Sequence, residues 1–198
     1  NIVGFNLNPA SNNTISGNTA NSNSNYGISL SSSSNNTLSN NTANSNTWYG
    51  IYLATSSNDN TFTGNTANSN AQYGFILSAS YNNRLTGNRA NANTYAGVGL
   101  TNADTNLFAQ NDISGNDTGV WFSGSARNNT LAKNNLSGNN VNHIRNQNAR
   151  TQTISRNWFG SADSVAISAK ITDTANAWAP WRLGLTDTAA GADTVAPK

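Results

Sequence analysis

The chain has 198 residues, enough for one domain, with 35% hydrophobic residues, 9% charged residues and a formal net charge of only +2. Disordered chains share this low hydrophobicity but usually carry a high net charge, so the composition favours a folded, polar protein. The chain has no cysteine or methionine, which excludes disulfide bonds and thiolate metal sites, and no apolar run long enough for a transmembrane helix.

In chain order, the first element expected in each repeat is a strand that follows a glycine. Apolar residues lie one and three positions beyond that glycine, as Ile28 and Leu30 do after Gly27. Alternation with a period of two in so short a run predicts a strand with one buried face. The glycines recur along the chain as Gly4, Gly27, Gly50, Gly74, Gly97 and Gly119.

The second expected strand is shorter and lies between two columns of amide residues. The first column comprises Asn13, Asn36, Asn60, Asn83, Asn106, Asn129 and Gln152. The second column, with spacings of 23, 24, 23, 23, 23 and 23, comprises Asn18, Asn41, Asn65, Asn88, Asn111, Asn134 and Asn157. An apolar column lies between them, and another follows: Ile15, Leu38, Phe62, Leu85, Phe108, Leu131 and Ile154, then Ala20, Ala43, Ala67, Ala90, Ile113, Leu136 and Phe159.

Strands that recur at a fixed period can pair with their equivalents one coil away. The repeat therefore predicts an all-β, right-handed, single-stranded parallel β-helix of about seven rungs with ~23 residues per rung. Asparagine tolerates the left-handed backbone of a sharp corner, and stacked amides can bond to one another, so the second column is predicted to be a structural ladder. We expect this domain and its closing segment to cover residues 1–185, followed by a linker-like tail over 186–198.

These repeats resemble those of the NosD-like and the carbohydrate-binding and sugar-hydrolase β-helix families. The pattern G-I-x-L, then N-T-L-x-x-N-x-A, covers residues 4 to about 160. The stretch Asn157-Trp158-Phe159-Gly160, followed by Ala179-Pro180-Trp181, resembles the N-W-x-G…P-W ending of such secreted domains. The resemblance implies an extracellular or cell-surface protein.

Copper is the metal that the NosD resemblance suggests, but copper sites use imidazole, thiolate or thioether ligands. The chain has one histidine, His143, in an irregular rung, and no sulfur. We therefore predict no metal site and no cofactor, and expect His143 to be a structural or surface residue.

Acidic residues are the groups that lyases, epimerases and hydrolases on this fold use, together with a base. The chain has no glutamate and eight aspartates. The local group that could form a catalytic or calcium site comprises Asp104, Asp112 and Asp117, with Arg127 and Lys133 in the following rung. Solvated corner residues explain the same pattern more simply, so whether the chain is an enzyme stays open, with a non-enzymatic role favoured.

Aromatic residues give a second candidate site, because sugar rings stack on them. Tyrosines recur before the glycine at positions 26, 49 and 73, Tyr95 lies one place off, and Trp48 flanks the same edge. Tyr52 and Trp121 each lie between two inward residues and should face outward, although Ser29, Ile76 and Gly99 interrupt their column. The predicted carbohydrate-binding residues are Trp48, Tyr49, Tyr52, Tyr73 and Trp121.

For function, these observations favour a non-enzymatic extracellular β-solenoid with a structural role. An uncovered first rung suggests head-to-tail self-association into a filament, or neighbouring domains in a larger surface protein. The alternative is a carbohydrate-binding or lyase- or epimerase-type β-helix with a polysaccharide partner.

Three further classes are less favoured. An ice-binding face would use the paired hydroxyls of Thr14/Ser16, Thr37/Ser39, Thr61/Thr63 and Thr153/Ser155, but Arg84, Leu107, Ala109 and Ala132 interrupt them. Asp59 is the only charged side chain before Arg84, and so sparse a charge speaks against a nucleic-acid partner. Membrane insertion is not expected either.

Overall fold

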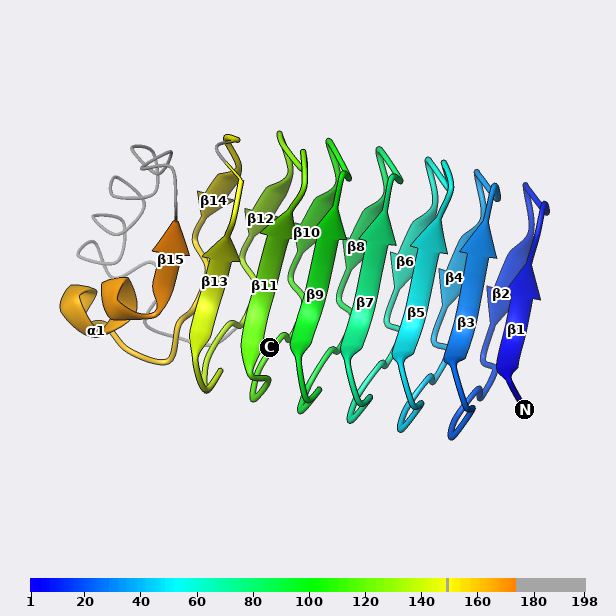
Figure 1. Ribbon diagram of the computed structural model, residues 1–198, viewed down its shortest axis with the longest axis horizontal. Coiled ribbons are helices and arrows are strands. Elements are labelled where there is room, and N and C mark those ends of the chain that lie inside the picture. The colour runs from blue at the N-terminus through cyan, green and yellow to red at the C-terminus, as the bar shows by residue number, and fades with distance from the viewer. Residues whose placement is uncertain (149, 174–198) are drawn as a thin grey trace.

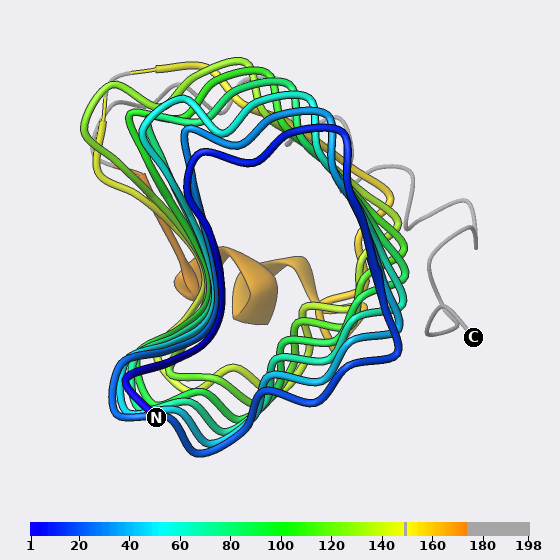
Figure 2. The same ribbon diagram turned by 90° about the vertical axis from the view of Figure 1, so that its right-hand side faces the viewer.

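The protein folds into a right-handed parallel β-helix, in which each turn of the chain forms one coil (Figures 1 and 2). This computed structural model describes residues 1–148 and 150–173. The predicted fold class and the repeat of about 23 residues are confirmed. The predicted ending around Ala179-Pro180-Trp181 and the linker-like tail over 186–198 lie outside the described residues.

The odd-numbered strands form one parallel sheet, in which each strand pairs with its equivalent one coil away. In the described residues these strands are β1 (Val3–Leu7), β3 (Tyr26–Ser31), β5 (Tyr49–Ala54), β7 (Tyr73–Ser78), β9 (Ala96–Thr101), β11 (Thr118–Ser123), β13 (Asn142–Asn146) and β15 (Ile171–Asp173).

The even-numbered strands form the second parallel sheet, on the opposite side of the coils. They are β2 (Thr14–Ser16), β4 (Thr37–Ser39), β6 (Thr61–Thr63), β8 (Arg84–Thr86), β10 (Leu107–Ala109), β12 (Thr130–Ala132) and β14 (Thr153–Ser155). A third side is held by single parallel bridges, from Thr19–Thr42 to Asn135–Trp158.

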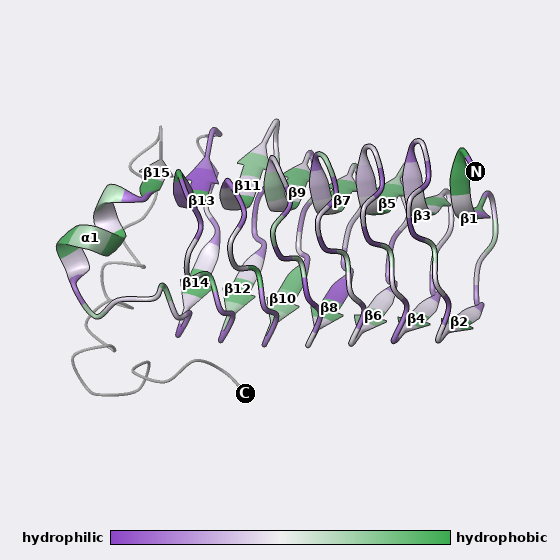
Figure 3. Ribbon diagram, turned by 90° about the horizontal axis from the view of Figure 1, so that it is seen from below, coloured by the Kyte–Doolittle hydropathy of each residue, from purple (hydrophilic) through white to green (hydrophobic). Residues whose placement is uncertain are grey.

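Apolar columns fill the interior of the coils, as the alternation predicts. Ile28 pairs in register with Ile51, and both are fully buried, as are Leu38 and Ala43. Hydrophobic segments lie mainly on the strands and on the helix, although β8 and β13 are largely hydrophilic (Figure 3). The largest fully buried side chains are Phe62, Phe75, Phe108 and Phe122.

Asparagine ladders bond successive coils together at the corners. In the second column, the backbone N–H and the side-chain Nδ2 of Asn88 both donate to Oδ1 of Asn111, at 2.8 and 3.1 Å. The predicted ladder is thus present, and the Asn13 column makes the same contacts. A third ladder, which the sequence analysis missed, comprises Asn23, Asn46, Asn70, Asn93, Asn116 and Asn139.

The odd-numbered sheet bends toward the interior, so its outer surface is concave, whereas the opposite wall is straighter (Figure 2). The glycine column explains the bend. A Cβ atom at Gly27 would lie 2.7 Å from Cβ of Ala43, so glycine and alanine let the two walls approach closely. We call this surface the concave face.

A short helix, α1 (Ser164–Ala169), lies at the C-terminal end of the described coils (Figure 1). Asp163 caps it by accepting a hydrogen bond from the Val165 backbone at 2.9 Å. Ile167 is 1% exposed and packs against the core, so the helix covers the last coil. Within residues 1–148 and 150–173, no helix has the length and apolar character needed to span a bilayer.

Candidate functional site

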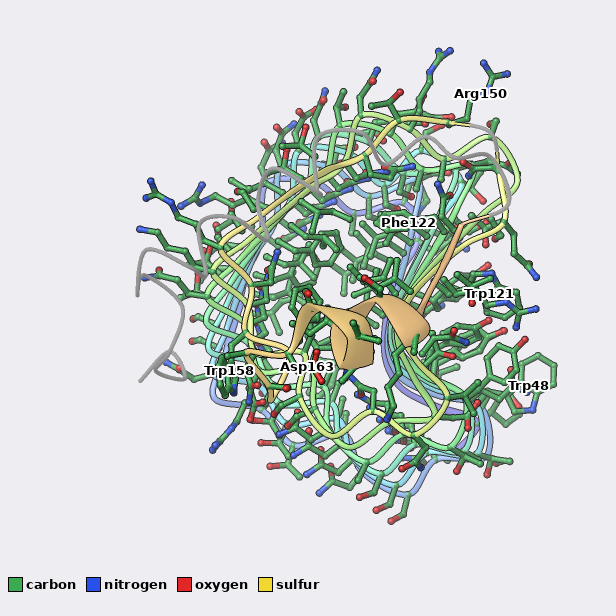
Figure 4. The ribbon with its side chains drawn as sticks, turned by 90° about the vertical axis from the view of Figure 1, so that its left-hand side faces the viewer. Trp48, Trp121, Phe122, Arg150, Trp158 and Asp163 are labelled. Atoms are coloured by element: carbon green, nitrogen blue, oxygen red, sulfur yellow. The ribbon has the colours of Figure 1, made fainter. Side chains whose placement is uncertain are left out.

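The predicted carbohydrate-binding residues all lie on the concave face. Tyr26, Tyr49 and Tyr73 stand in register on β3, β5 and β7. The glycine that follows each tyrosine faces the core, since a Cβ atom placed on it would meet core atoms. The preceding tyrosine therefore points outward. Figure 4 shows Trp48 and Trp121 outside the ribbon on the same side, whereas Phe122, next to Trp121, points into the core.

The structure brings these aromatic rings into continuous contact and adds two residues to the predicted set, Tyr26 and Tyr95. We call the seven rings the aromatic track: Tyr26, Trp48, Tyr49, Tyr52, Tyr73, Tyr95 and Trp121. Their centroids are separated by 5.2 Å from Tyr26 to Tyr49, 5.5 Å from Tyr49 to Tyr73, 5.2 Å from Tyr73 to Tyr95 and 4.8 Å from Tyr95 to Trp121. The track crosses β3 to β11, a distance of about 19 Å at ~4.8 Å per strand.

Ser29, Ile76 and Gly99, which interrupt the column in the sequence, leave no gap in the structure. Ser29 and Ile76 are only 7% and 8% exposed. A Cβ atom at Gly99 would lie 2.7 Å from Cε1 of Tyr73, so the tyrosine ring already occupies that space. Tyr73 therefore reaches across a coil and stacks on Trp121, with centroids 6.3 Å apart and planes 25° apart.

Charge is almost absent from the concave face. Within the strands β1 to β13 of this sheet, Arg145 is the one charged residue at an outward position, and Asp117, just before β11, continues the column of Trp48 and Tyr95. Burial raises the pKa of Tyr49, Tyr52 and Tyr73, and the neighbouring tyrosines raise each of them further. These hydroxyls therefore keep their protons at neutral pH and can donate hydrogen bonds, but they are poor general bases.

Most rings of the track expose their edges and hydroxyls to solvent, and two rings are more exposed than the others. Tyr26 and Tyr49 stack along the rod axis with planes 13° apart, so their faces contact each other. Trp48 and Tyr95 are the most exposed, at 42% and 38%. The face can thus offer both apolar contact and hydroxyl hydrogen bonds to a long ligand lying along the axis.

The candidate catalytic residues are not brought together into one site. Asp104 precedes β10 and pairs with Arg127 at 3.0 Å. Asp112 follows β10, lies 3.8 Å from Arg89 and accepts hydrogen bonds from Asn91 and Asn135. Asp117 precedes β11, and Lys133 lies at a left-handed corner after β12.

Among the described residues, no three acidic or histidine side chains gather closely enough to hold a metal ion. Asp104 and Asp112 instead bond to side chains of neighbouring coils.

The hydroxyl array considered for ice binding lies on the even-numbered sheet. Thr14, Thr37 and Thr61 are in register, and the bridge column adds Thr19, Thr42 and Thr66. From β8 onward Arg84 and Leu107 occupy the same column, so the array is regular over three coils only.

His143 is the one residue of the chain whose side chain is of a type that copper prefers as a ligand. It continues the glycine column in the last rung, where it is 5% exposed and packs 5.5 Å from the Phe159 ring. Its Nδ1 has no hydrogen-bond partner among residues 1–148 and 150–173. Burial lowers the pKa of His143 and the Lys170 ammonium lowers it further, while a hydrogen bond with the Leu136 backbone raises it.

A copper ion needs further soft or imidazole ligands beside this nitrogen. The whole chain has no second histidine, no cysteine and no methionine, so its residues do not fit a copper centre. His143 is buried in the described fold.

Comparison with known proteins identifies a family and several similar folds. The family model described as periplasmic copper-binding protein (NosD) matches residues 1–181. A search of curated proteins found no match. The A-module of mannuronan C-5 epimerase AlgE4 from Azotobacter vinelandii superposes with a TM-score of 0.70 and 22% identity, over 78% of this chain and 46% of that chain.

Two further solved structures share the fold. The periplasmic alginate epimerase AlgG has a TM-score of 0.69 and 21% identity, over 73% of this chain and 38% of its own. Tailspike protein 2 from Escherichia coli O157:H7 bacteriophage CAB120 has a TM-score of 0.60 and 18% identity, over 74% of this chain and 21% of its own. This chain spans less than half the length of each of these three proteins, and identities this low show a shared fold alone.

Proposed function

The chain belongs to the NosD family, and from this premise we propose that it is an exported, non-catalytic β-solenoid that binds a glycan along its concave face. The observation that supports this proposal most strongly is the aromatic track, which is continuous over five strands of the odd-numbered sheet. Sugars present apolar C–H faces and many hydroxyls, and the track offers partly exposed rings beside tyrosine hydroxyls. Two of the similar structures are named as alginate or mannuronan epimerases, which agrees with a glycan ligand.

Binding without catalysis is supported by the chemistry of the concave face. Glycoside hydrolysis uses two carboxyl groups that flank one bond. The outward positions of β1 to β13 carry no carboxylate, and Tyr49, Tyr52 and Tyr73 hold their protons tightly. Export agrees with the word periplasmic in the descriptions of NosD and AlgG.

The experiment that tests this proposal is affinity electrophoresis in gels containing different soluble polysaccharides. We expect at least one polysaccharide to retard the parent protein. The double variant Trp48→Ala/Tyr95→Ala, which removes the two most exposed rings, should lose this retardation. Trp158→Ala is the matched control, because Trp158 lies on another side of the coil (Figure 4). Equal retardation of all three proteins would place the ligand elsewhere.

A further inference from the structure

The C-terminal end of the aromatic track differs from the rest because polar side chains cover Trp121. The outward neighbour of Trp121 on the next coil is Arg145, whose Cζ lies 4.7 Å from the indole centroid. Gln147 lies two residues further along, and its Oε1 accepts a hydrogen bond from Trp121 Nε1 at 3.0 Å. One indole thus fixes the positions of two polar groups.

Both of these groups offer hydrogen-bond donors to a ligand. The indole N–H occupies Oε1 of Gln147, which turns its Nε2 amide group, with two N–H donors, away from Trp121. The Arg145 guanidinium makes no hydrogen bond and no ion pair with the described residues, in contrast to the side chains of Arg127 and Arg89, which pair with aspartates. The arginine is packed on an aromatic ring, as a guanidinium readily is, and its N–H groups lack acceptors.

We propose that Arg145 and Gln147, held by Trp121, form a subsite for an anionic group on the bound glycan, either the carboxylate of a uronic acid or a sulfate ester. This inference rests on the proposed glycan-binding function and narrows its ligand to an acidic polysaccharide. A planar guanidinium beside amide donors matches the oxygen atoms of a carboxylate or sulfate. A neutral sugar hydroxyl can accept from the same donors but carries no charge to pair with the guanidinium.

The position of the subsite determines where along the aromatic track an anionic group is bound. The outward positions of the strands β1 to β11 in this sheet carry no charge, and Asp117, in the column of Trp48 and Tyr95, is negative, so the anion is recognised only at Arg145. An acidic unit of the bound chain therefore lies beside Trp121, and the remaining units contact rings and hydroxyls along the track.

The test uses small sugars that differ in a single group. Methyl glucuronide, methyl glucoside and methyl glucoside 6-sulfate are titrated into the ¹⁵N-labelled protein, and the indole N–H signal of Trp121, assigned with Trp121→Phe, is followed. We expect one of the two anionic sugars to shift this signal with an affinity about tenfold higher than the neutral sugar, the size of one charged hydrogen bond. The stronger of the two anions identifies the substituent.

Arg145→Gln should abolish that preference. Arg150→Gln should keep it, because Arg150 lies at a corner of the coil away from Trp121 (Figure 4) and the substitution removes the same charge. Equal responses to the neutral and anionic sugars, or equal losses in both variants, would overturn the anion subsite.

The two proposals fail in different ways. If polysaccharide retention depends on Trp48 and Tyr95 but the Trp121 signal shows no preference for an anion, the subsite is wrong and the binding face remains. If the anion preference depends on Arg145 but no polysaccharide is retained, the proposed function is wrong.

Discussion

Removing one amide from the middle of a ladder should destabilise the whole rod. Asn88 is 2% exposed and takes part in four side-chain hydrogen bonds. Its Nδ2 donates to Asn111 Oδ1 and to the Phe62 carbonyl, and its Oδ1 accepts from the backbone N–H and from Nδ2 of Asn65. In Asn88→Ala the Asn65 Nδ2 still bonds to Leu38, but the buried backbone N–H of Asn65 loses its acceptor.

Leaving one such buried group unsatisfied costs about 1–3 kcal/mol, and we expect the free energy of unfolding to fall by this amount. Urea unfolding followed by far-ultraviolet circular dichroism measures the change. Asn18→Ala is the matched control: the Nδ2 of Asn18 donates to the Ser16 carbonyl and to Asn41 Oδ1, but no described ladder residue depends on its Oδ1 as an acceptor, so its loss should cost less. Parent-like unfolding of Asn88→Ala would show that the ladder contributes nothing to stability.

Three other predictions concern the core, the buried histidine and metals. Leu85 is 1% exposed, so Leu85→Ala should cost about 2–5 kcal/mol in urea unfolding, and more than Ile15→Ala in the first coil; equal costs would contradict the packing described. Because burial holds the pKa of His143 below its usual 6.5, the unfolded chain binds a proton more readily, and melting temperature should fall as pH drops below about 6.5. The fall in melting temperature with decreasing pH should be smaller in His143→Leu than in the parent protein. Equal falls in the two proteins would show that His143 does not cause the pH dependence. Adding copper or calcium should leave the melting temperature unchanged; a rise of several degrees would reveal a metal site.

The coil architecture could be predicted because each structural position repeats seven times. A buried column such as Leu38, Phe62 and Leu85 is visible at a fixed period even when its members differ. The third ladder, which includes Asn46 and Asn70, carried the same signal, five residues after the second. It was missed because exposed asparagines at neighbouring positions masked it in so asparagine-rich a chain.

The continuity of the concave face could not be predicted in the same way. Periodicity shows which position faces outward, but it does not show how far a side chain extends along the axis. Gly99 looked like a break, whereas the ring of Tyr73 fills its place and reaches Trp121. The burial of His143 also depended on the rung's position beside α1, which no repeat pattern encodes.

The central claim is that a glycan lies along the concave face. Titration of the ¹⁵N-labelled protein with a polysaccharide that retards it in gels, read at the five tryptophan indole N–H signals, tests this claim most directly. We expect the signals of Trp48 and Trp121, on the track, to shift or broaden together at the same ligand concentration, while that of Trp158 stays in place (Figure 4). A response confined to Trp158, with Trp48 and Trp121 unchanged, would contradict it.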